Sequence, residues 1–145
     1  MKVFLDTNVL IAAMVQKHAA HERALAVLER VQNGTDQGFV SAHGLAELYG
    51  VLTKLPPPLR HSPEQALLTI QENVLGYFKI ASLDGTDYSA LIRDAALAGI
   101  QGGTIYDAVL LKSAGKAAVD HIYTLNLKHF AAVAPMELRA KLREP

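Results

Sequence analysis

The sequence predicts an α/β fold in which helices cover a sheet of short parallel strands. Short apolar, β-favouring segments alternate along the chain with longer segments whose apolar residues recur at helical spacing. Strands separated by helices pair in parallel through right-handed crossovers. The chain has 145 residues, half of them apolar, which suits the core of one domain, so we expect a single domain over residues 1–145.

Five short strands are expected where apolar residues form brief runs. The clearest is Val3-Phe4-Leu5, whose unbroken apolar character is typical of a strand buried on both faces of a parallel sheet. The later runs are also short and apolar. In chain order, the expected strands are residues 3–5, 38–41, 77–83, 121–125 and 132–134.

Helices are expected between these strands. Ser41 can cap the helix after the second strand, in which Leu45 and Leu48 lie on one apolar stripe. Ser62 followed by Pro63 marks the start of the next helix, because proline is favoured at the first helical position. The expected helices are residues 9–14, 18–31, 42–54, 63–76, 84–98, 104–114 and 136–143.

Composition excludes several classes of protein. The formal net charge is zero, so no overall basic field attracts nucleic acid, and a polyanion must be held locally or through metal ions. The chain has no cysteine, which excludes disulfides, thiol catalysis and cysteine–zinc sites. No apolar stretch is long enough to cross a bilayer and no signal peptide is evident, so we expect a soluble, cytoplasmic protein.

Three carboxylates stand at or just beyond the carboxyl ends of expected strands or near the start of a helix. Asp6 ends the first strand, Glu47 lies on the helix after the second, and Asp107 lies near the start of the helix after Gly103. A parallel sheet brings such junctions to one edge, where open α/β sheets bind their ligands. Three converging acids repel one another unless a cation neutralises them, and oxygen ligands suit Mg²⁺ or Mn²⁺.

Each of these carboxylates also has a structural explanation. The first could cap the helix that follows it, as could the threonine and asparagine beside it. Glu47 could pair with His43 or Lys54 on the surface of its own helix. Asp107 stands three residues after Thr104, an arrangement that approximates a capping box.

The segment after the fourth strand adds polar candidates. Thr124 could hydrogen-bond a carboxylate, and Asn126 could offer a neutral oxygen to a metal or hold a water. Lys128 could meet a phosphate, and His129 is a further candidate for phosphate contact. The structural alternative is an ordinary Asx turn leaving the strand, with Phe130 filling the core.

Together these segments resemble the signature blocks of the PIN-domain family and, more narrowly, the VapC-type toxins of bacterial toxin–antitoxin pairs. The resemblance extends over essentially the whole chain, with the blocks in the right order and spacing. Each block is weak alone, but the four together are specific. The blocks are Asp6-Thr7-Asn8, Ala46-Glu47-Leu48, Tyr106-Asp107-Ala108 and Thr124-x-Asn126-x-Lys128-His129-Phe130.

The resemblance implies a three-layer α/β/α sandwich with strand order 3-2-1-4-5 and a Mg²⁺- or Mn²⁺-dependent endoribonuclease. The family's acids map onto Asp6, Glu47 and Asp107 as metal ligands. The fourth acidic position corresponds to Asn126, which we include among the catalytic candidates, and His129 stands where some relatives carry an aspartate. This departure weakens the case for a second metal ion. Thr7, Asn8 and Thr124 are the supporting residues.

The expected chemistry is hydrolysis of an RNA phosphodiester by metal-activated water, which leaves 5′-phosphate and 3′-hydroxyl ends because no 2′-hydroxyl attack is needed. The resemblance also implies a homodimer and a cognate antitoxin that inserts a segment into the acidic site. A further candidate surface is the segment 112–143, which contains six lysines and arginines but only two acids. This net positive segment could bind RNA or an acidic antitoxin segment.

Two rival functions are weighed against the nuclease. A phosphotransferase with Asp6 as nucleophile, as in haloacid-dehalogenase-type sheets, needs a second acid where this chain has Asn8. A catalytically weak PIN-like module that binds RNA or a protein partner is favoured by the missing fourth acid. The other histidines show no metal-ligand spacing and receive no role; they are His18, His21, His43, His61 and His121.

Overall fold

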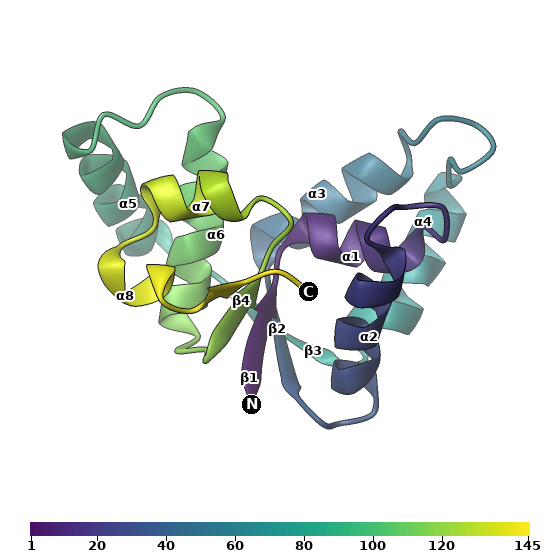
Figure 1. The fold of residues 1–145 in the computed structure, drawn as a ribbon. Coiled ribbons are helices and arrows are strands. Elements are labelled where there is room, and N and C mark those ends of the chain that lie inside the picture. The colour runs from purple at the N-terminus through teal and green to yellow at the C-terminus, as the bar shows by residue number, and fades with distance from the viewer.

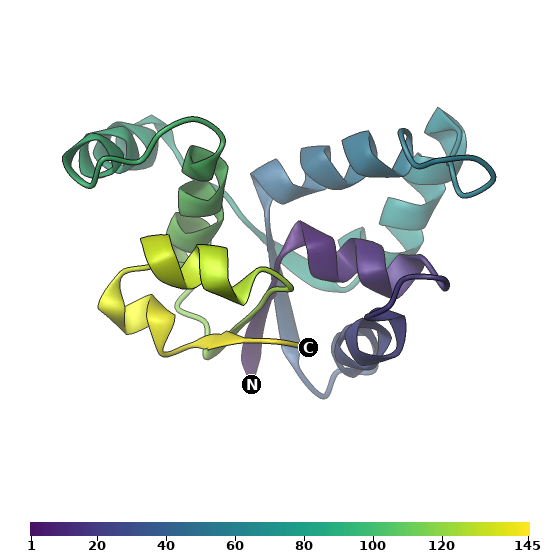
Figure 2. The same cartoon turned by 45° about the horizontal axis from the view of Figure 1, so that its top comes forward.

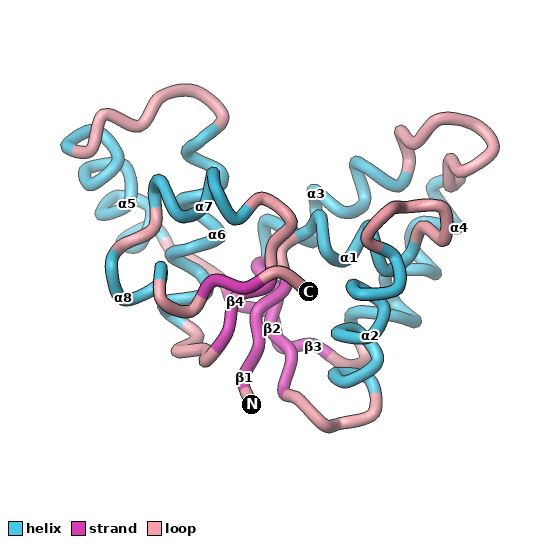
Figure 3. The backbone as a smooth tube through the Cα atoms, viewed as in Figure 1, coloured by secondary structure: helices cyan, strands magenta, loops and turns pink.

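A computed structural model describes residues 1–145 and shows a five-stranded sheet between two groups of helices (Figure 1). All neighbouring strands are parallel, and their order is β3-β2-β1-β4-β5, which confirms the predicted topology. Figure 3 shows the strands gathered at the centre of the molecule with helices to either side. The strands are β1 Lys2–Leu5, β2 Gln37–Ser41, β3 Phe78–Ala81, β4 His121–Tyr123 and β5 Leu142–Arg143.

The helices form two layers that lie on opposite sides of the sheet. Figure 2 shows α1 and α3 running from the centre to one side, while α6 and α7 lie on the other. The first layer holds α1 Thr7–Met14, α2 His21–Gln32, α3 Ala42–Leu52, α4 Pro63–Ile70 and the π-helical turn η1 Gln71–Leu75. The second holds α5 Gly85–Leu97, α6 Thr104–Lys116, α7 Leu127–Val133 and α8 Met136–Arg139.

Alternation along β1 explains the two layers. Val3 and Leu5 belong to the larger apolar core, which is built with α1, α2 and α3. Phe4 points to the opposite face and joins the smaller core, with Ile122 of β4 and Phe130 of α7. Successive side chains of a strand point to opposite faces, so β1 is buried from both sides and fixes the centre of the sheet.

The predicted helix caps are confirmed. The Gly44 N–H donates to Ser41 Oγ at 2.8 Å and starts α3 directly after β2. Ser62 and Gln65 form a reciprocal capping box at the start of α4, with Pro63 at the first helical position. These caps set where two of the helices begin, and the first of them lies beside the candidate site.

The prediction for the C-terminal segment was wrong. Residues 132–134, expected as a strand, belong mostly to α7, because Phe130 and Ala134 bury an apolar face against α6. The expected helix 136–143 stops at Arg139, and residues 142–143 form β5 instead. The N–H groups of Ile122 and Thr124 donate to backbone carbonyls of this segment, at 2.9 Å and 3.0 Å. The unpaired edge of β4 therefore decides the conformation of the last residues.

Several boundaries also shift. The second helix begins at His21 rather than at His18, because the His18 ring accepts a hydrogen bond from the Ala20 N–H in a turn. The third and fourth strands are shorter than expected and end at Ala81 and Tyr123. The helix predicted over 63–76 continues beyond Ile70 as a π-helical turn.

Gly38→Ala is expected to destabilise the fold by about 1–3 kcal/mol, the usual effect of overpacking a core. A Cβ atom at Gly38 would lie 2.5 Å from Val31 Cγ1 and 2.6 Å from Phe78 Cδ1, both in buried side chains. Urea unfolding measures the change. Gly50→Ala in α3 is the matched control, since nothing lies within 4 Å of its added Cβ and alanine favours helix. Equal stability of Gly38→Ala and wild type would contradict the close packing.

Candidate functional site

The carboxyl ends of β1, β2 and β4 meet at one edge of the sheet, at the upper end of the strands in Figure 1. Asp6 follows β1 directly and is only 2% exposed. Its backbone N–H donates to the Tyr123 carbonyl at 3.0 Å, which joins it to the end of β4. The buried carboxylate is thus held by the two central strands.

Thr124 links this carboxylate to the segment after β4. Its Oγ1 donates to Asp6 Oδ2 at 2.9 Å and accepts a hydrogen bond from the Asn126 N–H at 3.0 Å. Asp6 stands at the N-cap position of α1; its side chain makes no full capping hydrogen bond, and the Thr7 and Asn8 N–H groups are the smallest of the influences on its pKa. The predicted contact between Thr124 and a carboxylate is confirmed.

The electrostatics of two acids show that the site concentrates negative charge. The pKa of Asp6 is raised to about 6, chiefly by burial and to a smaller degree by the charge of Glu47, while the hydrogen bond from Thr124 lowers it. Burial also raises the pKa of Asp107; the charge of His129 lowers it and that of Glu47 raises it. Because the charge of Glu47 raises the pKa of both aspartates, the three predicted acids lie within range of electrostatic interaction through Glu47.

Glu47 is half-buried on α3 and pairs with His43 one turn earlier. The His43 Nε2 lies 3.6 Å from Glu47 Oε2, so the pairing considered from the sequence occurs with His43. The His43 ring stacks on Tyr106 of α6, with ring centroids 5.3 Å apart and an angle of 6° between the planes. The sequence had assigned no role to either ring, although His43 precedes Glu47 by one helical turn and Tyr106 precedes Asp107 directly.

Asp107 does not form the capping box suggested by its spacing. The N-cap of α6 is Gly103 and makes no side-chain cap, and Thr104 is already inside the helix. Asp107 is partly buried and forms no salt bridge. Asp107 still lies in the first turn of α6, where a negative charge suits the helix dipole, so that structural explanation applies beside its place among the other acids.

Thr7 leaves a buried hydroxyl without a partner. It is 1% exposed, and its Oγ1 makes no hydrogen bond. A Cβ at Gly44 would lie 3.1 Å from Thr7 Oγ1 and 2.9 Å from Ser41 Oγ, so only glycine fits between these hydroxyls. Buried polar atoms are normally paired, and an unpaired one beside an acidic site is consistent with a bound water or ion. Asn8, the next residue, is half-buried.

The site therefore suits a hard divalent cation. Its candidate ligands are oxygen atoms, its carboxylates repel one another, and the Thr7 hydroxyl has no partner. No three histidine, aspartate or glutamate side chains lie close enough together to enclose an ion. The charge of Glu47 still raises the pKa of both aspartates, although burial is the larger cause in each case.

The segment after β4 places fewer of its side chains at the candidate site. Asn126 is exposed and reaches the site through its backbone N–H. Lys128 and His129 are exposed on the first turn of α7, and Lys128 makes no ion pair. Phe130 is 1% exposed in the smaller core, so the structural alternative for this residue is confirmed.

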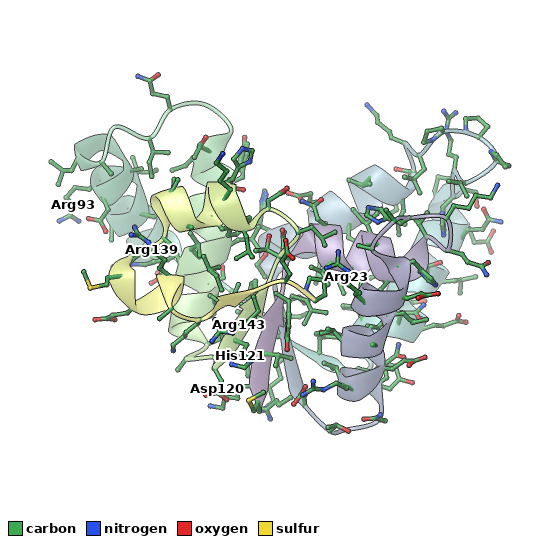
Figure 4. The ribbon with its side chains drawn as sticks, in the orientation of Figure 1. Arg23, Arg93, Asp120, His121, Arg139 and Arg143 are labelled. Carbon is green, nitrogen blue, oxygen red and sulfur yellow. The ribbon has the colours of Figure 1, made fainter.

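The basic residues of 112–143 do not form one patch. Lys116 pairs with Asp87 at 2.6 Å, and Lys141 donates to the Val119 carbonyl at 2.7 Å. Arg139 and Arg143 also donate to backbone carbonyls, and Figure 4 shows them at separate places. Most of this charge therefore serves to hold the C-terminal layer together.

A comparison with protein families matches the PIN domain model to residues 3–134. The chain belongs to the PIN domain family. The strand order agrees with that family's fold, as expected from the sequence. Ribonuclease VapC40 of Mycobacterium tuberculosis is 32% identical over 123 residues, which cover 85% of each chain. Ribonuclease VapC27 of the same species is 31% identical over 137 residues, 94% of this chain and 85% of the relative.

Solved PIN domain structures support the same fold. VapBC2 from Rickettsia felis, bound to a DNA fragment from its promoter, has a TM-score of 0.67 and 20% identity, and the match covers 100% of this chain and 99% of that one. Mycobacterium tuberculosis VapC20, described as a sarcin–ricin loop cleaving toxin, has a TM-score of 0.69 and 16% identity, with coverages of 92% and 96%. In this chain, none of the helices is both long and apolar enough to span a bilayer.

Proposed function

We propose that this PIN domain is a metal-dependent endoribonuclease toxin of a toxin–antitoxin pair. The observation that carries the proposal is the buried Asp6 carboxylate at the carboxyl edge of the sheet. The negative charge of Glu47 helps to raise its pKa. The relatives named as VapC ribonucleases support the same activity. The products are 5′-phosphate and 3′-hydroxyl ends.

Asp6, Glu47 and Asp107 would hold Mg²⁺ or Mn²⁺ through their carboxylate oxygens. When bound, the ion supplies Lewis-acid activation of water and neutralises charge on the phosphate. Thr124 donates to Oδ2 of Asp6, and the backbone N–H groups of Thr7 and Asn8 also lie close enough to lower the pKa of this carboxylate.

Other residues would position the RNA. Asn126 would offer its side-chain amide in the place of a fourth acid, and its backbone N–H already donates to Thr124 Oγ1. Lys128 and His129 on the first turn of α7 are exposed and contact a phosphate of the backbone in this proposal. Because water is the nucleophile, cleavage does not depend on a 2′-hydroxyl.

The partners in this proposal are RNA, a cognate antitoxin protein and a second copy of the chain in a homodimer. Two of the structural neighbours, VapBC2 and VapBC-1, are VapBC complexes, which supports an antitoxin partner. The cytoplasm is the compartment consistent with an RNA-cleaving toxin of this kind.

A second candidate function is a catalytically weak PIN module that binds RNA or a protein partner. Asn126 and His129 occupy positions where an acid would strengthen metal binding, and no three acidic or histidine side chains enclose an ion. This module would bind RNA without cutting it.

Incubation of the purified protein with total RNA and Mg²⁺ or Mn²⁺ tests the proposal. We expect discrete fragments with 5′-phosphate ends, and their loss in EDTA and in Asp107→Asn. A nuclease of known activity on the same RNA is the positive control. Metal-independent cutting would contradict the proposal, and intact RNA together with Mn²⁺-independent RNA binding would favour the binding module.

A further inference from the structure

Two aromatic rings form a flat, exposed stack immediately beside the acids. The rings of His43 and Tyr106 are nearly parallel, with centroids 5.3 Å apart, a distance typical of favourable aromatic pairs. Tyr106 is 54% exposed, whereas His43 is half-buried beneath it. One ring face of Tyr106 is therefore backed by His43 while much of the ring remains open to solvent.

The stack is fixed to the same two helices as two of the acids. His43 lies one turn before Glu47 on α3, and the contact between Nε2 and Oε2 at 3.6 Å ties its ring to that acid. Tyr106 directly precedes Asp107 on α6. Helices α3 and α6 are in contact, so the stack joins them next to the candidate site. A ligand resting on Tyr106 would be placed relative to the acids by rigid elements.

Because the protein has no net positive charge, base stacking would be an important source of its affinity for a nucleic acid. The formal net charge is zero, and four of the six basic residues in 112–143 already bind carboxylate or carbonyl oxygens. A chain with no net positive charge has little long-range attraction for the phosphate backbone, which normally supplies much of the affinity for nucleic acid. Aromatic side chains can supply part of the missing binding affinity, because every base has a π-face that can stack on an aromatic ring.

We propose that the open face of Tyr106, backed by His43, stacks an unpaired nucleobase of the RNA beside the phosphodiester that is cut. The proposal rests on the nuclease function above. Bases inside a duplex already stack on their neighbours, so the surface selects single-stranded or looped RNA. In this proposal Tyr106 is a substrate-binding residue, and His43 is the residue that positions its ring.

The test uses a single-stranded RNA oligonucleotide containing 2-aminopurine, whose fluorescence falls when the base stacks. Binding is measured in an Asp6→Asn background so that the probe stays intact. We expect quenching on binding, and an affinity loss of about tenfold with loss of quenching in Tyr106→Leu. Tyr106→Phe keeps the ring and should keep both signals. Tyr77→Leu is the matched control, because Tyr77 is 48% exposed before β3, at the opposite edge of the sheet.

The results separate this proposal from the proposed function. If Tyr106→Leu and Tyr77→Leu bind and quench alike, or if a duplex probe binds as tightly as the single strand, the stacking surface is wrong. If the wild type quenches the probe through Tyr106 but does not cut RNA with Mn²⁺, the surface stands and the nuclease proposal fails. Circular dichroism checks folding, and Tyr106→Gln replaces Tyr106→Leu if the latter unfolds.

Discussion

Asp6→Asn is expected to slow RNA cleavage by at least about 100-fold, because charge stabilisation by a bound ion is worth several kcal/mol. The substitution keeps the shape of the side chain and lets it accept the Thr124 hydroxyl, which now donates to Oδ2 at 2.9 Å. It removes the charge that would hold Mg²⁺ or Mn²⁺. Initial cleavage rates over a range of Mn²⁺ concentrations measure the effect.

The matched control for this prediction is Asp120→Asn. Asp120 precedes β4, at the opposite edge of the sheet from Asp6, and accepts the Lys2 N–H at 2.8 Å. Figure 4 shows it near the N-terminal end of β1. We expect Asp120→Asn to cut RNA at the wild-type rate. Wild-type cleavage by Asp6→Asn would show that this carboxylate does not bind the essential ion.

Asp6 is also expected to make the metal-free protein less stable as the pH rises. Its pKa is about 6 in the folded protein, against an ordinary value of 3.8, because burial favours the protonated form. The stability that it contributes is fully present below about pH 4 and is lost as the pH rises through its folded pKa of about 6. The loss is on the order of 2–3 kcal/mol, since each pKa unit corresponds to about 1.4 kcal/mol.

Urea unfolding in EDTA, for wild type and Asp6→Asn, isolates this contribution from those of other titrating groups. Asp6→Asn should gain stability relative to wild type between about pH 4 and about pH 7, and Mn²⁺ should stabilise wild type more than the variant. Parallel pH curves for the two proteins would show that the carboxylate titrates normally in the fold.

Much of the architecture was predictable because it depends on local pattern. The unbroken apolar run Val3-Phe4-Leu5 indicated a central strand, and the caps at Ser41 and Ser62 marked helix starts that the structure confirms. The C-terminal segment was not predictable in this way. Residues 142–143 are extended because β4 offers an unpaired edge, and such pairing between distant segments leaves no local signal.

The candidate site shows the same division. Its three acids were identified from their places after strands and near helix starts, and the same reasoning suggested Thr124 as a partner for a carboxylate. The stack of His43 on Tyr106 was missed, because the two rings are distant in sequence and meet only when α3 and α6 pack together.

The sequence by itself determined the α/β class, the order of elements up to β4, and which carboxylates stand at strand ends. These depend on side-chain periodicity and on the residues that favour helix ends, which are local properties. Tertiary structure alone decided the burial of Asp6 and its raised pKa, the fifth strand, and the open face of Tyr106. Each of these depends on which distant groups exclude water or supply a partner, and that is settled only when the two helical layers close on the sheet.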